Sequence, residues 1–258
     1  MDANKIEALI TPHTTAIMPV HVYGNPCEVE KIERIAKKNN LKVIYDAAHA
    51  FAVKKNKKSI LNFGDLSVLS FHATKTFNTF EGGAIVSHDL ATKTRVDNLK
   101  NFGITGEVTV VEPGINAKMN ELQSAFGLLQ LKEIDANIAK RKLATEQYRK
   151  LLKDMNGIRM LEDMKDVEHN YSYFPIFINK EFNLTRDGLY EKLKLSNIFT
   201  RRYFYPLVST FSPYNSFTSS HKNNLNSAYQ LSEEVLCLPI SSELSSEQIE
   251  FIVKAIKK

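Results

Sequence analysis

The sequence predicts an α/β protein with a mainly parallel sheet in its first half and a smaller α+β unit in its second half. Short apolar strands alternate with helical patterns from residue 15 to about residue 101. A long helical pattern follows and changes partway from apolar to charged, as helices that bridge two domains often do. We therefore expect part of a large domain over residues 1–118, a bridging helix over 119–155 and a small α+β domain over 156–258.

The composition of the 258 residues argues against several classes of protein. Hydrophobic residues make up 43% and charged residues 24%, as in soluble globular proteins, and no apolar run is long enough to span a membrane. The first residues lack the pattern of a secretory signal, so we expect a cytoplasmic location. The net charge is +5, but the lysines are scattered and form no basic stripe with aromatic residues, which argues against nucleic-acid binding. Cys27 and Cys237 form neither a metal-binding spacing nor a disulfide framework.

The first elements predict a parallel strand–helix–strand unit. We expect a short helix over residues 4–10 and a strand over 15–22, whose continuous apolar character indicates burial on both faces. The sequence Asn-Pro-Cys-Glu at residues 25–28 predicts the start of a helix, with the asparagine as N-cap. This helix ends near residue 39, and the strand over 41–45 follows at a spacing that suits a right-handed crossover.

Asp46 directly follows this strand, at the edge of the sheet where open α/β proteins bind ligands. A further apolar strand, residues 67–71, leads toward Lys75 at the same edge, and the next strand begins at Gly83. A lone lysine in a polar turn is usually a solvated charge. A lysine that can form a Schiff base, together with an aspartate that can hold a pyridinium nitrogen, is however the minimal set for pyridoxal phosphate chemistry.

The remaining elements are helices and short strands. After the strand at Gly83, we expect helices over 89–101, 185–195, 224–235 and 246–256, and strands over 171–178, 199–204 and 235–240. Thr185 precedes the second of these helices and is its predicted N-cap.

Several stretches carry a resemblance to a known family. In chain order they are Pro19 to Gly24, Tyr45 to His49, Ser70 to Gly83, Gly114 to Ala125, Arg201 to Pro206, and Leu238-Pro239. With these stretches the chain resembles the sugar aminotransferases of the DegT/DnrJ/EryC1/StrS family. The resemblance implies the aspartate aminotransferase-like fold (PLP fold type I) and pyridoxal 5'-phosphate as cofactor. The sequence from His72 to Gly83 resembles that of the family branch that acts on nucleotide-linked 3-keto-6-deoxyhexoses.

The resemblance implies the roles of Lys75 and Asp46. Lys75 would bind the cofactor covalently and move a proton during transamination, which requires that burial favours its neutral amine. Asp46 would pair with the pyridinium nitrogen. The structural alternatives are a surface lysine and an aspartate that caps the next turn.

The resemblance also implies that further residues bind the cofactor. His49 matches the family position that faces the phenolic edge of the cofactor, and Ser70 matches a hydroxyl that contacts its phosphate. Asn116 matches an asparagine that reaches the phosphate bound by the other subunit, which implies a homodimer. The alternatives are a half-buried structural histidine, a strand-end serine with a local bond, and a loop asparagine in a left-handed turn.

Substrate contacts are implied for His72, Arg201 and Tyr203, although aromatic runs like the one around Tyr203 are more often core than ligand contacts. Many relatives carry arginine where this chain has Lys118, so this position departs from the family pattern and no charged contact is assigned to it. No metal site is expected.

The implied reaction is transfer of an amino group, from glutamate as the expected donor, to a nucleotide-linked keto-6-deoxy sugar of the dTDP-3-keto-6-deoxyhexose type. The family's first strand and helices, the small-residue turn that holds the phosphate and the aromatic residue that stacks on the cofactor have no counterpart in this sequence. The alternative is therefore a catalytically inactive fragment that acts at most as a dimerising module. A third alternative, dehydration of a keto sugar, is disfavoured by Lys75, because family members with that activity carry histidine there.

Overall fold

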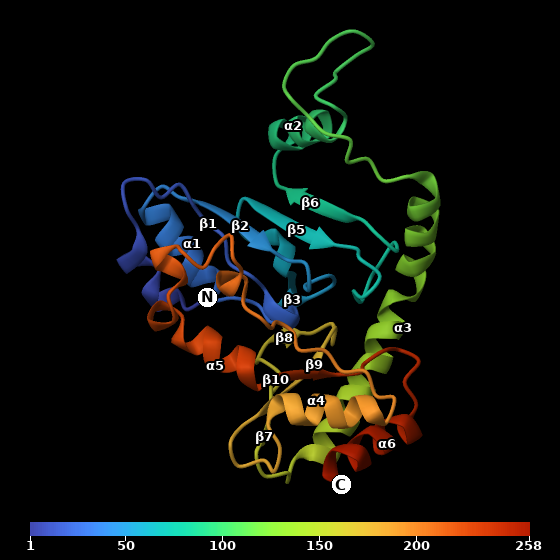
Figure 1. Ribbon diagram of the computed structural model, residues 1–258. Helices are drawn as coiled ribbons and strands as arrows, with labels where there is room; N and C mark the ends of the chain where they lie inside the picture. The colour runs from blue at the N-terminus through green and yellow to red at the C-terminus, as the bar shows by residue number, and fades with distance from the viewer. The chain divides into compact units, whose positions relative to one another are not determined.

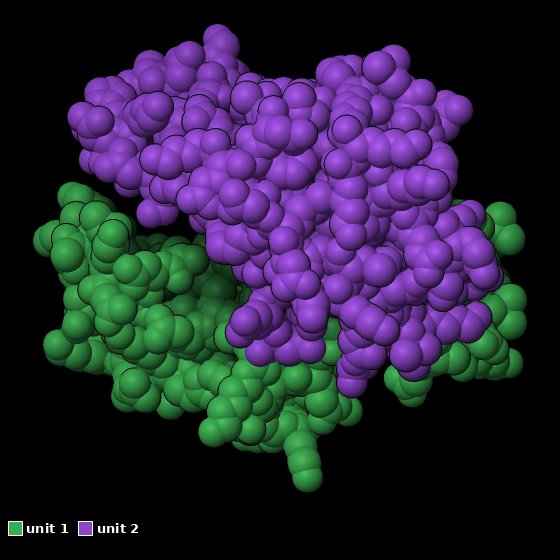
Figure 2. All heavy atoms as spheres, turned by 90° about the horizontal axis from the view of Figure 1, so that it is seen from below, with its two compact units in different colours: residues 1–136, 164–172 green, residues 137–163, 173–258 purple.

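In the computed structural model, which describes residues 1–258, the chain forms two units. Unit 1 comprises residues 1–136 and 164–172, and unit 2 comprises residues 137–163 and 173–258 (Figure 2). The helix α3 (Glu121–Leu152) contains the expected long helical pattern and contributes residues to both units.

Unit 1 is built on a four-stranded sheet in the order β1-β2-β5-β6 (Figure 1). The strands are β1 (Ala16–Ile17), β2 (Lys42–Asp46), β5 (Leu66–Ser70) and β6 (Gly83–Ser87). β1, β2 and β5 are parallel, and β6 runs antiparallel to β5. The predicted mainly parallel sheet is therefore present, with one antiparallel edge strand.

One face of this sheet packs on helix α1 (Val29–Lys38). Its apolar residues recur at helical spacing, and Val29 and Ile32 are fully buried in a cluster that also holds Val43, Tyr45 and Leu69 from the sheet. Because side chains alternate along a strand, the residues between these sheet positions point to the opposite face.

The start of α1 differs from the prediction. The helix begins at Val29 with Glu28 as its N-cap residue, so the expected asparagine cap at residue 25 is wrong. Residues 22–24 instead form the 3₁₀ turn η3 (Val22–Gly24), in which Tyr23 has a φ of 58° and Gly24 a φ of 91°. This turn also ends the expected strand over 15–22, of which only β1 and a single bridge from Val20 to Asp46 form.

The remaining elements of unit 1 are short, apart from α2. The expected helix over 4–10 is a pair of 3₁₀ turns, η1 (Ala3–Lys5) and η2 (Glu7–Leu9), and η4 (Ile60–Asn62) is a third. α2 (Leu90–Lys100) lies beside β6. A small antiparallel sheet consists of β3 (Lys54–Lys55), β4 (Lys58–Ser59) and β8 (Val167–Glu168), and it attaches the segment 164–172 to unit 1.

Unit 2 is an α+β arrangement around the antiparallel sheet β10-β9-β7. Its strands are β7 (Ile158–Met160), β9 (Phe174–Ile178) and β10 (Val235–Leu238), and its helices are the end of α3, α4 (Arg186–Leu195), α5 (Asn226–Glu234) and α6 (Ser246–Lys257). Short 3₁₀ turns lie at Val208–Thr210, Thr218–Ser220 and Lys222–Asn224. The predicted cap of α4 is confirmed, since the Thr185 side chain accepts a hydrogen bond from the N–H of Gly188. The expected strand over 199–204 is wrong: only Arg201 pairs, in an isolated bridge with Cys237.

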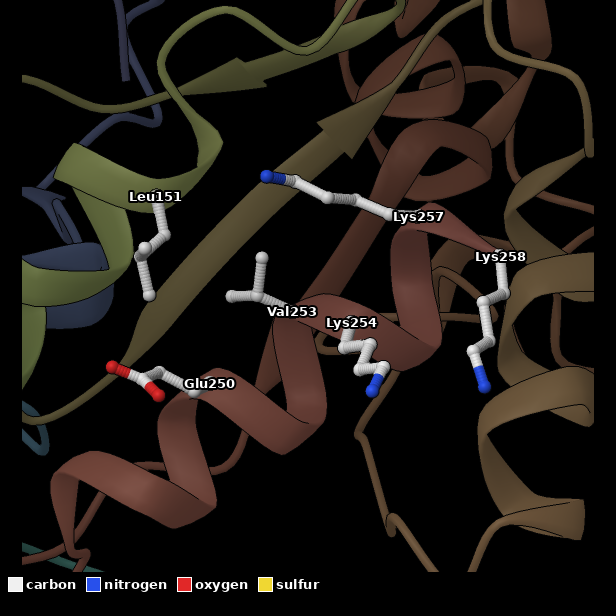
Figure 3. Close-up of a pocket in the computed structure, with 6 residues that line it drawn as sticks. All are labelled: Leu151, Glu250, Val253, Lys254, Lys257 and Lys258. Atoms are coloured by element: carbon white, nitrogen blue, oxygen red, sulfur yellow. The ribbon is translucent and has the colours of Figure 1, made fainter.

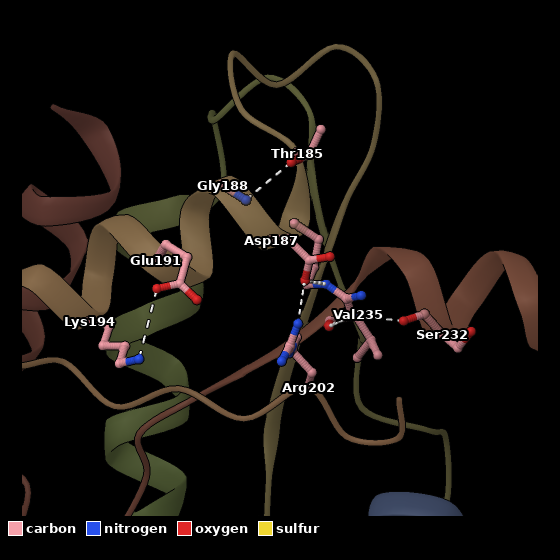
Figure 4. Close-up of polar contacts among 9 residues, drawn as sticks. Thr185, Asp187, Gly188, Glu191, Lys194, Arg202, Ser232 and Val235 are labelled. Atoms are coloured by element: carbon pink, nitrogen blue, oxygen red, sulfur yellow. Dashed lines mark hydrogen bonds and ion pairs between the residues drawn. The ribbon is translucent and has the colours of Figure 1, made fainter. Parts of the chain in front are cut away.

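Polar contacts join the start of α4 to Arg202, Ser232 and Val235 in unit 2 (Figure 4). Arg186 is 4% exposed, and its Nη1 donates to the carbonyl oxygens of Ser232 at 2.7 Å and Val235 at 3.2 Å. Asp187 accepts from Nε of Arg186 at 2.7 Å and from Nη1 of Arg202 at 2.9 Å, and these cations lower the pKa of its carboxyl group. The hydrogen bonds from Arg186 to the two carbonyls hold the start of α4 against the end of α5 and the start of β10.

A hollow on the surface of unit 2 is lined mainly by α6 (Figure 3). Glu250 lies at one end, and Lys254, Lys257 and Lys258 stand around Val253 and Leu151. No helix of the chain is both long enough and apolar enough to cross a membrane.

Candidate active site

The register of the sheet places Asp46 and Ser70 on the same face. Asp46 is paired with Val68 of the parallel neighbour β5, and Ser70 lies two residues beyond Val68. Side chains two residues apart share a face. Both polar groups therefore project from the face opposite α1, at the carboxyl ends of their strands, where open α/β sheets bind ligands.

Lys75 lies in a loop over residues 71–82 whose base is closed by backbone bonds. The N–H of Phe71 donates to the carbonyl of Gly82 at 2.8 Å, and the N–H of Thr79 donates to the carbonyl of Phe71 at 2.9 Å. The Thr79 hydroxyl also donates to the carbonyl of Glu81 at 2.6 Å. These hydrogen bonds connect the start of the loop to its end and keep it compact.

An aromatic cluster anchors the same loop from within. Phe77 is 4% exposed, stacks on Phe51 with 4.4 Å between ring centroids, and meets Phe71 edge-on at 4.8 Å. Aromatic contacts of this geometry stabilise beyond the area they bury. Since Phe77 is two residues from Lys75, burial of its ring limits how far the lysine backbone can move.

The charge state of Lys75 is set by two opposing effects. Partial burial lowers the pKa of its amine, and the negative charge of Asp46 acts in the opposite direction. Burial is the larger effect, so the pKa lies below the ordinary value for lysine. This is the direction that a nucleophilic amine requires.

His49 is buried, and its ring is held in one protonation pattern. Nδ1 accepts a hydrogen bond of 3.0 Å from the backbone N–H of Tyr23, so the proton of the neutral ring lies on Nε2. Burial and then the charge of Lys75 lower the pKa of His49 to about 4, against the opposing effect of Asp46. At neutral pH the ring is uncharged and Nε2–H is a donor.

The charge of Asp46 acts on the pKa of both His49 and Lys75, and the charge of Lys75 acts on the pKa of His49, so the three groups lie within electrostatic range of one another. Asp46 also accepts a bond of 3.0 Å from the N–H of Ala48, which fixes one carboxylate oxygen. Ser70 accepts a long bond of 3.4 Å from the N–H of His72.

The other predicted residues lie in different surroundings. His72 is exposed, with its Nδ1 2.8 Å from the hydroxyl of Thr74 and its Nε2 3.8 Å from a carboxylate oxygen of Glu81. Asn116 is exposed in the loop before α3 and pairs with Asn101 in an isolated bridge.

Lys118 donates to the side-chain oxygen of Asn101 at 2.6 Å. Arg201 and Tyr203 belong to unit 2, where the ring of Tyr203 meets that of Tyr173 edge-on at 5.7 Å. A substrate role for these residues stays a prediction.

Sequence reasoning missed the residues behind His49. Tyr23 supplies the bond to its ring, and Asn170 and Ser172 contact the same region from the segment 164–172. A signal for Tyr23 was available, because a break at Gly24 indicates an irregular turn. Nothing in the sequence pattern links Asn170 with a histidine 121 residues earlier.

The chain is similar in sequence to several curated proteins. A curated dTDP-4-amino-4,6-dideoxy-D-glucose transaminase from Shigella dysenteriae is 49% identical over 254 residues, which cover 98% of this chain and 69% of that protein. The enzyme of the same name from Escherichia coli is 49% identical over 257 residues, which cover 99% of this chain and 69% of that protein. GDP-perosamine synthase from Escherichia coli O157:H7 is 34% identical over 262 residues, with 100% and 69% covered.

Solved structures show the same fold. DesI, crystallised in the presence of its TDP-sugar product, matches with a TM-score of 0.93 and 30% identity over 100% of this chain and 65% of its own. PseC of Helicobacter pylori is an aminotransferase involved in the biosynthesis of pseudoaminic acid. It matches with a TM-score of 0.93 and 27% identity, over 100% of this chain and 70% of its own. The chain thus spans about two thirds of the length of these relatives.

The predicted fold class, an α/β fold of the aminotransferase type, is confirmed by these structures. The model of the DegT/DnrJ/EryC1/StrS aminotransferase family matches residues 1–257. The family resemblance seen in the sequence is therefore confirmed, and this chain belongs to the DegT/DnrJ/EryC1/StrS aminotransferase family.

Proposed function

We propose that this protein transfers an amino group from an amino acid to a keto carbon of a nucleotide-linked 6-deoxy sugar, with pyridoxal phosphate as cofactor. The observation that carries the proposal is the convergence of Lys75, Asp46 and His49, with a lowered amine pKa at Lys75. The 49% identity to curated sugar transaminases over nearly the whole chain supports the same reaction.

The side chains at this edge of the sheet fit pyridoxal phosphate. Asp46 offers a carboxylate for the pyridine nitrogen, and the Nε2–H of His49 offers a donor for the phenolic oxygen. Ser70 offers a neutral hydroxyl for the phosphate, and Lys75 offers an amine for the aldehyde. The cofactor would supply an aldehyde that takes up the amino group and a ring that withdraws electrons from the substrate carbon.

Lys75 has the properties of the proton carrier in this site. Its lowered pKa increases the neutral fraction of Nζ at neutral pH, and a neutral amine can accept a proton from a substrate carbon and return it. The closed base of the loop over 71–82 and the buried ring of Phe77 keep Nζ in one region. The negative charge of Asp46, which acts to raise the pKa of Lys75, would stabilise the protonated amine between the two transfers.

The acceptor that we propose carries its keto group at C4. The two relatives that are 49% identical are named for a 4-amino-4,6-dideoxyglucose linked to dTDP. Their names favour dTDP-4-keto-6-deoxyglucose over the 3-keto isomer that the wording from His72 to Gly83 resembles. Glutamate as donor, a homodimer with Asn116 at the neighbouring cofactor, and a cytoplasmic location complete the proposal.

The test compares cofactor binding with turnover. Purified protein is titrated with pyridoxal phosphate, and a visible absorption band of lysine-bound cofactor is expected in the wild type and not in Lys75→Ala. Lys118→Ala is the matched control, because Lys118 contacts Asn101 outside the group around Asp46. Glutamate should then bleach the band.

Addition of either keto sugar identifies the acceptor. Mass spectrometry should detect an amino sugar from the 4-keto substrate at a higher rate than from the 3-keto isomer. Protein that folds but gives no band at millimolar cofactor would refute the proposal and favour the inactive dimerising module.

A further inference from the structure

The backbone around His49 is held by a buried asparagine from the segment 164–172. Asn170 is 1% exposed, and its Nδ2 donates to the carbonyl oxygens of His49 and Phe51, both at 2.8 Å. Its Oδ1 accepts from the N–H of Ser172 at 3.2 Å. Both the nitrogen and the oxygen of the side-chain amide are thus hydrogen-bonded, as is usual for buried polar groups.

The ring of His49 is held by the same segment through a second route. The hydroxyl of Ser172, which is 5% exposed, donates to the carbonyl of Tyr23 at 3.0 Å. The N–H of the same Tyr23 donates to Nδ1 of His49 at 3.0 Å. We name Asn170, Ser172, Tyr23 and His49 the His49 clamp.

We propose that Asn170 and Ser172 are positioning residues for His49, and that they fix the tautomer and direction of its imidazole for the cofactor. Asn170 fixes the backbone that carries the ring, and Ser172 fixes the residue whose N–H occupies Nδ1. The inference rests on the proposed function for the identity of the ligand that Nε2–H would face. It assigns catalytic support to a segment that no motif of the sequence marks.

The attachment of the segment does not depend on these side chains. Glu168 and Val167 pair with β3 through the backbone, and Lys54 forms an ion pair of 2.8 Å with Glu168. Removal of one hydroxyl from the His49 clamp should therefore leave the segment in place. A variant without this hydroxyl therefore reports on the position of the His49 ring and not on folding of the segment.

Ser172→Ala is the central variant, with Ser172→Thr to restore the donor and Ser232→Ala as the matched control. Ser232 is also 5% exposed, and its hydroxyl donates to the carbonyl of Tyr229 at 2.8 Å, in unit 2. Both alanine variants lose one buried hydroxyl bonded to the carbonyl of a tyrosine. Their costs in stability should be similar, so any difference at His49 reports positioning.

The readout is the NMR spectrum of the His49 ring in cofactor-free protein. Wild type should show a neutral ring with its proton on Nε2 and a pKa far below that of exposed histidines. In Ser172→Ala, weaker donation to Nδ1 should raise the pKa of His49 by about half a unit or more. Asp46 and Lys75, whose charges also act on His49, are unchanged in these variants.

Binding of pyridoxal phosphate is the second readout. Ser172→Ala should raise its dissociation constant about tenfold, Ser172→Thr should restore it, and Ser232→Ala should leave it unchanged. An unchanged His49 pKa and cofactor affinity in Ser172→Ala would overturn the inference. A wild-type ring with its proton on Nδ1 would also overturn it, even if the variant failed to fold. If the ring behaves as expected and no cofactor binds, the proposed function fails and the His49 clamp stands.

Discussion

A Cβ atom placed on Gly24 would lie 2.8 Å from Oδ1 of Asn170, closer than real Cβ contacts allow. The same Cβ would lie 3.0 Å from the carbonyl oxygen of His49. Gly24 also has a φ of 91°, which residues with a side chain rarely adopt. The turn at residues 22–24 and the His49 clamp therefore fit together only because residue 24 lacks a side chain.

Gly24→Ala should destabilise the protein by about 1–3 kcal/mol, from backbone strain and from displacement of Asn170. Urea denaturation measures the change. Because the displaced groups hold His49, the variant should also bind pyridoxal phosphate more weakly. Gly106→Ala is the control, since a Cβ atom placed on Gly106 would have no neighbour within 4 Å and no stability loss is expected. Equal urea midpoints for Gly24→Ala and Gly106→Ala would contradict the close packing of Gly24 against Asn170.

Phe77→Ala should cost about 3–5 kcal/mol, because it removes a buried ring that contacts both Phe51 and Phe71. The loop that carries Lys75 should loosen as well, and hydrogen exchange of the amides at 72–80 should become faster. Phe251→Ala, at a position that is 56% exposed on α6, is the matched control and should cost about 1 kcal/mol or less. If the amides at 72–80 of Phe77→Ala exchanged hydrogen no faster than in the wild type, the aromatic cluster would have no part in positioning Lys75.

The residues that carry local signals could be predicted from the sequence. Asp46 and Lys75 each follow an apolar strand, so strand pattern and the parallel crossover place both at one edge of the sheet. The start of α1 was misplaced because the turn at 22–24 uses left-handed backbone that composition does not reveal. The run over 199–204 favours a strand by its aromatic residues, but only Arg201 finds a pairing partner.

The His49 clamp could not be predicted for a different reason. The bonds from Asn170 to His49 and from Ser172 to Tyr23 join residues 121 and 149 positions apart, and side-chain periodicity contains no information on such contacts. Asn170 shows this best. Its buried amide satisfies two carbonyl groups of a distant turn, and no local sequence signal indicates these contacts.

Stability should fall as the pH decreases from about 6.5 to about 4. Burial lowers the pKa of both His21 and His49 to about 4, against an ordinary value of 6.5. In this range the unfolded chain binds protons that the folded protein does not, so the free energy of unfolding decreases with falling pH. Each histidine contributes at most about 1.4 kcal/mol per pH unit. Urea denaturation at a series of pH values measures the slope, and His49→Gln should reduce it. A slope that His49→Gln leaves unchanged would show that this ring titrates as it does in the unfolded chain.

Arg186→Lys should destabilise unit 2 by about 2–3 kcal/mol, although the charge is kept. The guanidinium of Arg186 bonds to the carbonyls of Ser232 and Val235 and to Asp187 at once, and a lysine amine cannot match that planar geometry. Arg95→Lys is the control. Arg95 pairs with Glu112 at 3.1 Å, but its side chain is 71% exposed, so the cost there should stay below about 1 kcal/mol. Thermal unfolding of both variants gives the comparison. If Arg186→Lys were as stable as Arg95→Lys, the positive charge alone, and not the directed bonds, would hold α4 against α5.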